Sequence, residues 1–206
     1  MHPQRTLEIL DKNRSIKNAY ISRIRSLENT YGIFTLYLVM KKKSTPYQNR
    51  NLYLHANNKV WYDKLLYPGR TTNCMISMQA SSEDSQYASV ISILTPMYID
   101  ELSAWKDTTP EHRGEDYQSF KKEKAEQILR FIRGHGIDLS ENIEEMYDTT
   151  PLSYRDYTGT VDGSAYGIIK DYKCPQIGFV STRSRLGNLF FTGQNLNGHG
   201  ALGVTL

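Results

Sequence analysis

A glycine-rich turn near the end of the sequence has the residue types and spacing of a phosphate-binding motif. Gly198, Gly200 and Gly203 form the pattern G-x-G-x-x-G, which follows the apolar run at residues 189–191. Glycine lets a ligand approach unpaired backbone N–H groups that a Cβ would keep at a distance. A complete dinucleotide-binding unit also needs an acidic residue about twenty positions later, whereas three residues follow Gly203. The pattern alone therefore fits either the last turn of a nucleotide-binding fold or a plain terminal loop.

The other side chains that could do chemistry are scattered along the chain. The histidines at positions 55, 112 and 135 stand in unlike contexts, and Cys74 and Cys174 are far apart. We therefore predict no metal site and no disulfide, which favours a reducing compartment. His199 could act as a base, but a lone histidine in a glycine turn more often positions the backbone. We assign no catalytic acid or base.

Composition indicates a folded protein with a core of ordinary size. The 206 residues are 39% hydrophobic and 23% charged, which fits one large domain or one and a half smaller ones. The net charge of +3 is too small to indicate a nucleic-acid partner. No apolar run is long enough to span a bilayer, and no signal peptide opens the sequence. We expect a soluble cytoplasmic protein, and peripheral membrane contact stays open.

The order of the elements favours an α+β fold with a mixed, largely antiparallel sheet and helices on one face. An unbroken apolar run predicts a central strand at residues 32–40, and a helical stripe predicts a long helix at residues 115–133. Thr95 and Pro96 have the residue types of a helix start. We predict further strands at 52–55, 72–80, 87–94, 143–147 and 188–192, and further helices at 3–10, 15–28, 97–105 and 151–157.

Four segments resemble successive blocks of the phytoene desaturase and retinol saturase family, in the order that the family has them. They are HPQRTLEILD, SRIRSLENTYGIFTLYLVMK, TPLSYRDYTGTVDGSAYGIIKDY and LFFTGQNLNGHGALGV, and together they extend over nearly the whole chain. This family consists of FAD-dependent oxidoreductases within the wider group of amine-oxidase-like flavoproteins. The resemblance implies that the chain is the C-terminal part of a larger flavoenzyme, which would supply the FAD-binding N-terminal part.

The resemblance also implies a division of the chain and a set of cofactor contacts. Residues 1–12 would be a helix that follows a strand of the FAD domain, and residues 13–170 would be the substrate domain. Residues 171–206 would return to the Rossmann-type FAD domain as its last strand and glycine turn. The implied contacts to the ribityl chain or phosphates are Gly193 and Gln194, and those under the isoalloxazine ring are His199, Gly200, Ala201 and Leu202.

A lipophilic polyene such as a carotenoid or retinoid is the substrate that the resemblance implies, with C=C bonds either desaturated or saturated. NAD(P)H is an option as electron donor. The candidates to line the substrate tunnel are Tyr37, Tyr53, Tyr154, Tyr157 and Tyr166, because a conjugated hydrocarbon needs an aromatic and mostly dry wall. Half-buried packing is the alternative for each tyrosine. A non-catalytic module that binds an apolar ligand or a protein is the alternative for the chain.

Overall fold

The computed structural model describes residues 2–10, 16–58, 69–193 and 195–198. The chain divides into two compact units. The first, which we call the sheet unit, is Ile33–Thr150, and the second, the terminal unit, combines Met1–Gly32 with Pro151–Leu206. None of the helices in the described ranges is long and apolar enough to cross a membrane. The division of the chain by function stays a prediction.

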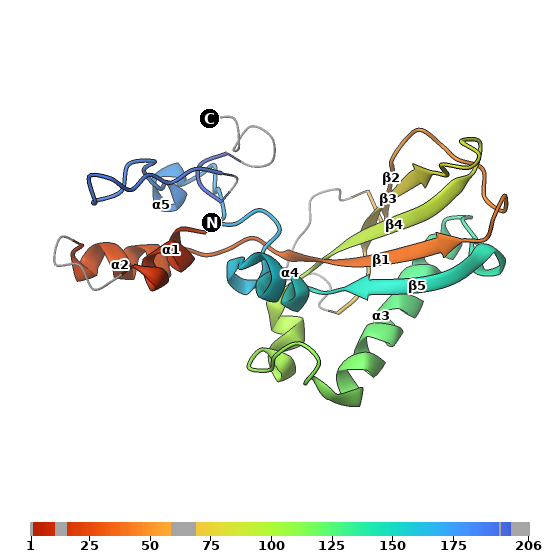
Figure 1. Cartoon of the computed structure of the whole chain (residues 1–206), viewed down its shortest axis with the longest axis horizontal. Coiled ribbons are helices and arrows are strands. Elements are labelled where there is room, and N and C mark those ends of the chain that lie inside the picture. Colours follow the sequence, from red (N-terminus) through yellow and green to blue (C-terminus); the bar gives the residue numbers. More distant parts are fainter. Residues whose placement is uncertain (1, 11–15, 59–68, 194, 199–206) are drawn as a thin grey trace. The chain divides into compact units, whose positions relative to one another are not determined.

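Five antiparallel strands form the open sheet of the sheet unit (Figure 1), which confirms the predicted α+β class. Their order across the sheet is β2-β3-β4-β1-β5, so the first strand lies between two strands that follow much later in the sequence. The strands are β1 (Gly32–Met40), β2 (Leu52–His55), β3 (Asn73–Ala80), β4 (Ala88–Met97) and β5 (Ile143–Thr149). The bounds of β1 and β2 are those that the sequence predicts.

One face of the sheet is buried beneath the long helix α3 (Gly114–Gly134). Alternate residues of β1, among them Leu36 and Leu38, have at most 4% of their surface exposed. Leu36 pairs across the strands with Asp148, and Asp148 forms an ion pair of 2.7 Å with Lys121 of α3. Paired residues of antiparallel strands point to the same face. The helix therefore covers the face that carries Leu36 and Leu38 (Figure 1).

A buried lysine joins α3 to the short 3-10 helix η1 (Ile99–Trp105). Lys124 lies within the apolar stripe of α3 and is 3% exposed. Its Nζ donates to the Glu101 carboxylate and to the Gly69 carbonyl, both at 3.3 Å. The Trp105 ring also packs against Phe120 of α3, with 5.1 Å between ring centroids. Both helices of this contact therefore lie on the same side of the sheet.

The predicted helix start at Thr95 and Pro96 is wrong, because β4 continues through both residues to Met97. The Thr95 hydroxyl donates to the Asn73 carbonyl of the neighbouring strand at 2.8 Å instead of capping a helix. The helix begins at Ile99, where Glu101 forms a capping box with Tyr98. A capping signal is local, and here the buried strand outweighs it.

The terminal unit packs short helices around a small apolar core. Its helices are α1 (Pro3–Ile9), α2 (Asn18–Arg25), α4 (Pro151–Thr158), η3 (Val161–Gly163) and α5 (Pro175–Gly178), and α2 is shorter than predicted. The core consists of Ile24, Leu27, Ile168, Val180, Phe191 and Leu196. It joins α2 to residues that lie far away in the sequence.

The predicted strand at residues 188–192 is wrong, since this segment forms only an isolated bridge between Arg183 and Phe190. Its backbone bonds run within the C-terminal segment itself: the Phe191 N–H donates to the Thr182 carbonyl at 2.8 Å. A strand needs the backbone of a neighbouring strand as its partner, and the described part of this unit places only this short return of the chain beside it.

Two glycines of the terminal unit, Gly163 and Gly167, let backbones approach closely. Gly163 has φ +62°, and a Cβ on it would stand 1.9 Å from the Pro151 carbonyl oxygen. Gly167 has φ +70°, and a Cβ there would stand 2.4 Å from the Asn195 side chain. Only glycine adopts these conformations without strain and leaves the necessary space. Gly163 therefore packs against the start of α4, and Gly167 packs against the C-terminal segment at Asn195.

Candidate functional site

The side of the sheet opposite α3, which we call the open face, collects side chains from all five strands. The described helices of this unit that pack on the sheet, α3 and η1, lie on the other side. The strand registers and the alternation of side chains assign the members of the open face. They are Thr35, Tyr37, Val39, Tyr53, His55, Asn73, Met75, Ser77, Gln79, Val90, Ser92, Leu94, Pro96, Glu145, Tyr147 and Thr149.

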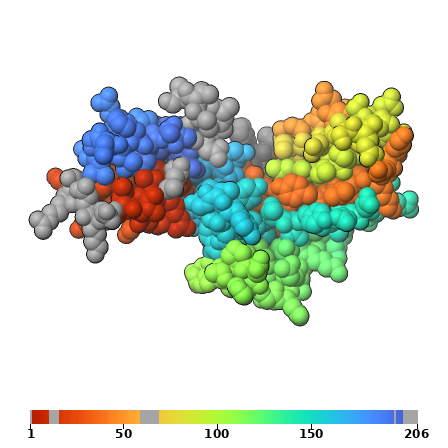
Figure 2. Space-filling view, viewed as in Figure 1, coloured from red at the N-terminus to blue at the C-terminus, as the bar shows by residue number. Residues whose placement is uncertain are grey.

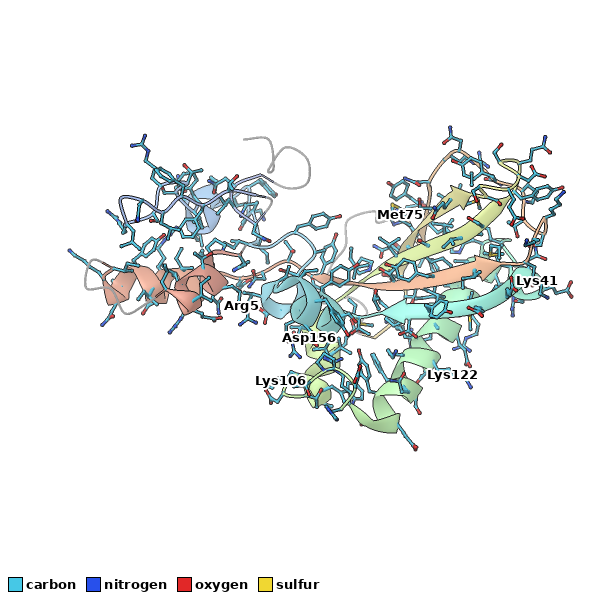
Figure 3. The ribbon with its side chains drawn as sticks, viewed as in Figure 1. Arg5, Lys41, Met75, Lys106, Lys122 and Asp156 are labelled. Carbon is cyan, nitrogen blue, oxygen red and sulfur yellow. The ribbon has the colours of Figure 1, made fainter. Side chains whose placement is uncertain are left out.

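An apolar row crosses the strands β2, β3 and β4 on the open face. Tyr53 of β2 pairs with Met75 of β3, and Met75 pairs with Leu94 of β4. Figure 3 shows Met75 on the side of the sheet away from Lys122 of α3. Neighbouring strands are about 4.8 Å apart, so the row extends over roughly 10 Å and its side chains can contact one another. It forms a continuous strip of aromatic, thioether and aliphatic surface.

Two tyrosines form a second apolar contact at the other end of the sheet. Tyr37 of β1 lies directly opposite Tyr147 of β5, and the two strands form neighbouring bands in Figure 2. The Tyr147 hydroxyl donates to Glu145, and this hydrogen bond raises the pKa of Tyr147 above its ordinary value. Glu145 is the only Asp, Glu, Lys or Arg among the members of the open face. The face is therefore almost free of charge and combines apolar with uncharged polar side chains.

The structure brings together two of the five tyrosines that were predicted to line a tunnel. Tyr37 and Tyr53 share the open face. Tyr154, Tyr157 and Tyr166 belong to the other unit, where Tyr157 is 77% exposed. The ring of Tyr166 meets Tyr31 edge-on at 6.3 Å, so it has a packing partner in its own unit.

Sequence reasoning did not find Met75, Leu94 and Tyr147 as members of this surface. In β3 the apolar alternation of the sequence is the opposite set, Cys74, Ile76, Met78 and Ala80, which is the set facing α3. Met75 shares its face of the strand with the polar residues Asn73 and Ser77, so its periodicity gives no signal of an apolar face. Pairing with Tyr53 and Leu94 places it in the row, and that pairing depends on the register between strands.

Gly193 is the one predicted cofactor contact within the described residues, since Gln194, His199, Gly200, Ala201 and Leu202 lie outside them. Its φ of +110° is a conformation that other residues rarely adopt. No heavy atom of the described residues lies within 4 Å of the point where a Cβ would stand. A ligand can therefore approach this backbone closely, which fits a cofactor contact.

The chain around Gly193 is held in place by side chains on both sides. Phe191 and Leu196 are 5% and 4% exposed within the core of the terminal unit. The Asn197 amide donates to the Val180 carbonyl at 2.7 Å and accepts from the Val180 N–H at 2.9 Å. The Asn195 Oδ1 atom has no hydrogen-bond donor among the described residues and lies against Gly167, where it is shielded from a ligand. Asn195 is therefore a packing residue.

A cavity of about 460 Å³ lies at the end of the sheet where β1 ends and where the chain turns between β3 and β4. Lys42 and Lys43 line it, and they pair with Glu83 at 3.0 Å and with Asp84 at 3.6 Å. Glu144, Tyr87 and three serines complete much of its wall. Val39, Met40 and Ala88 add apolar groups, so the lining of the cavity is mixed. Covering the two ion pairs with a hydrocarbon would cost free energy, so the open face is the stronger candidate for a polyene.

Cys74 lies behind the open face, on the side that α3 covers. Burial raises the pKa of its thiol to about 12, so the thiolate that a nucleophile requires is scarce at neutral pH. We therefore exclude Cys74 as a nucleophile. The open face offers packing surface, and any redox chemistry beside it would have to come from a cofactor.

A comparison of the chain with protein-family models gives no match. A comparison with curated proteins gives no significant match either. The resemblance to the phytoene desaturase and retinol saturase family therefore rests on the four sequence segments, and the function that it implies is a proposal.

Proposed function

We propose that the chain is the substrate-domain part of an FAD-dependent oxidoreductase that desaturates or saturates C=C bonds of a lipophilic polyene, such as a carotenoid or retinoid. The observation that carries the proposal is the open face, which is nearly uncharged and holds Tyr37, Tyr53, Met75, Leu94 and Tyr147. A flat conjugated chain binds through many weak contacts with aromatic and thioether groups. It has no polar atoms with which to compensate a buried charge.

The opposite side of the sheet gives this wall its rigidity. Phe34, Ile91 and Ile93 are fully buried beneath α3, and close-packed cores of this kind move little. The ion pair between Lys121 and Asp148 adds a polar tie between the helix and the edge strand β5. The strands can therefore hold the polyene-facing side chains in fixed positions while a substrate binds.

FAD would accept or deliver the hydride, and the protein would supply orientation and exclude water. Gly193 supports a cofactor contact by its glycine-only conformation and free space. Gln194 and residues 199–202 are the other cofactor contacts in this proposal. In the same proposal the terminal unit is part of a Rossmann-type FAD domain. NAD(P)H is the proposed electron donor for the saturating direction.

Polyene binding tests the open face directly. The probe is cis-parinaric acid, a conjugated tetraene whose fluorescence rises in an apolar site. We expect Tyr37→Ser and Met75→Ser each to weaken binding by about five- to tenfold, since partial loss of one buried side chain costs on the order of 1 kcal/mol. Tyr157→Ser is the matched control, because Tyr157 is exposed in the other unit. Equal affinity for all three variants would refute the open-face site.

FAD titration tests the cofactor contact on the chain itself, whereas the flavin content of the native protein separates the enzyme from its alternative, a module that binds an apolar ligand or a protein. We expect the chain alone to bind FAD weakly. Backbone donors near Gly193 contribute about 1 kcal/mol each, and a few of them do not offset the cost of association. A sub-micromolar Kd by calorimetry would show that the cofactor site is misplaced. In cells of its source, an antibody should detect the chain within a flavin-containing protein larger than 23.7 kDa; a flavin-free protein would favour the binding module.

A further inference from the structure

A loop of the terminal unit exposes an unusual number of large apolar side chains. We call residues 169–179 the α5 loop, because they include α5 and the turn before it. Its residues 171–177 are all exposed, and four of its apolar side chains reach the surface: Ile169 at 36%, Tyr172 at 86%, Ile177 at 66% and Phe179 at 54%. Single exposed apolar residues are common on soluble proteins, whereas a group of them marks an interaction site.

Contacts beneath the α5 loop hold these side chains outward. Gly178 is buried so closely against Ile169 that a Cβ would stand 2.4 Å from the Ile169 carbonyl oxygen. Ile177 and Phe179 flank this buried glycine, so their side chains are turned away from the core. The Arg23 guanidinium donates to the Phe179 carbonyl at 2.7 Å and to the Ile177 carbonyl at 3.4 Å. The exposed apolar group therefore belongs to a fixed part of the fold.

The α5 loop carries Lys170, Asp171 and Lys173, a net charge of +1, and it belongs to the more basic of the two units. The terminal unit has eleven Lys and Arg against six Asp and Glu, a net charge of +5, whereas the sheet unit has fourteen against sixteen, a net charge of −2. Within the loop, the Lys173 ammonium lies 5.8 Å from the Tyr172 ring centre. Arg183 and Arg185 follow the loop in the sequence. Aromatic side chains beside lysine and arginine are typical of surfaces that bind the interface of an anionic bilayer.

We propose that the α5 loop docks the terminal unit on the surface of an anionic lipid bilayer. Tyr172, Ile177 and Phe179 enter the boundary between headgroups and acyl chains. Lys173 and the two arginines that follow the loop contact the lipid phosphates. The net charge of +5 on the terminal unit favours a bilayer over a protein partner, because anionic headgroups attract a basic unit. This docking depends on neither a flavin nor a polyene, so it stands apart from the proposed function.

Cys174 provides a probe at the exposed side of the loop. It is exposed, while Cys74 is buried, so a nitrobenzoxadiazole maleimide should label Cys174 alone in the folded chain. We expect the emission to shift to the blue and increase with vesicles of phosphatidylcholine and phosphatidylserine. Vesicles of phosphatidylcholine alone should give a much smaller change, and added salt should reduce the effect. A spectrum unchanged by the anionic vesicles would overturn the proposal.

Variants of the loop complete the test in a vesicle flotation assay. Ile177→Ser with Phe179→Ser should lower the bound fraction at least tenfold at fixed lipid concentration. Tyr172→Ser, at the most exposed of these positions, should lower it severalfold with the far-UV circular dichroism spectrum unchanged. The control is Ile9→Ser with Tyr157→Ser, which removes two exposed apolar residues of the terminal unit outside the α5 loop and should not alter binding.

A protein partner is the competing explanation, and the same variants detect it. If the chain sedimented as a dimer that Ile177→Ser with Phe179→Ser converts to a monomer, and vesicle binding did not change, the α5 loop would be a protein interface. Equal binding of the loop variants and the control would likewise refute membrane docking through this loop.

Discussion

Replacing Gly163 with alanine tests the close backbone contact at the start of α4, because Gly159 offers a matched control four residues away. Both glycines have positive φ values, +62° at Gly163 and +68° at Gly159. At Gly163 a Cβ would stand 1.9 Å from the Pro151 carbonyl oxygen, whereas at Gly159 no heavy atom of the described residues lies within 4 Å. The two substitutions therefore differ mainly in the space around the added methyl group.

The expected losses follow from these two geometries. An alanine in the left-handed region costs about 1–2 kcal/mol, and we expect this loss of stability for Gly159→Ala. Gly163→Ala carries the same cost and must also displace the Pro151 backbone, and forced displacement in a packed region costs about 1–3 kcal/mol more. Its expected total is therefore about 2–5 kcal/mol. The change in unfolded-state entropy is the same for both and cancels in the comparison.

Urea unfolding followed by far-UV circular dichroism measures both losses on the full chain. The fluorescence of the tryptophans, which both belong to the sheet unit, serves as an internal reference. We expect the loss at Gly163 to exceed the loss at Gly159 by at least about 1 kcal/mol. Equal losses would refute the reasoning, since they would show that the Pro151 backbone yields to a methyl group without cost.

Three further predictions concern individual side chains. Lys124→Ala should cost about 2–4 kcal/mol in urea unfolding, because it leaves the Glu101 carboxylate without its cation in a largely buried site, whereas Lys122→Ala on the exposed side of α3 should change little. A thiol reagent such as dithionitrobenzoate should titrate one thiol, Cys174, in the folded chain and two in denaturant; rapid reaction of both would contradict the burial of Cys74. Burial lowers the pKa of His2 below 6.5, so the unfolded chain binds more protons in that range and stability should fall as the pH drops below about 6.5. A variant without this histidine should show a weaker pH dependence in unfolding experiments at pH 7.5 and 5.5.

Elements with strong local patterns could be predicted from the sequence. The nine-residue run of β1 is apolar except for Thr35, and Gly32 and Met40 bound the strand in both the prediction and the structure. The buried stripe of α3 repeats at helical spacing from Tyr117 to Ile132, which is about four turns. In a strand, the same spacing would distribute these side chains over both faces. Even Lys124, a charged residue within this stripe, lies at the buried position that the spacing gives it.

Two local signals failed because the deciding interaction came from elsewhere in the chain. Thr95 and Pro96 suit the start of a helix, but the Thr95 hydroxyl bonds to β3 and Met97 is fully buried as the end of β4. The residues at 188–192 suit a strand, but only the return at Arg183 bridges to them. A capping residue or a β-prone run acts on its own neighbourhood, whereas the sheet partner is supplied by tertiary structure.

The sequence by itself determined that Tyr37 and Tyr53 lie in strands and that side chains alternate along each strand. It did not determine that both tyrosines face away from α3, or that Met75, Leu94 and Tyr147 join them. A strand carries two possible faces, and a shift of one residue in its pairing exchanges them. The joint burial of Leu36, Ile76 and Ile93 beneath one helix determines which face of each strand is covered. That packing sets the register of strands that lie far apart in the sequence.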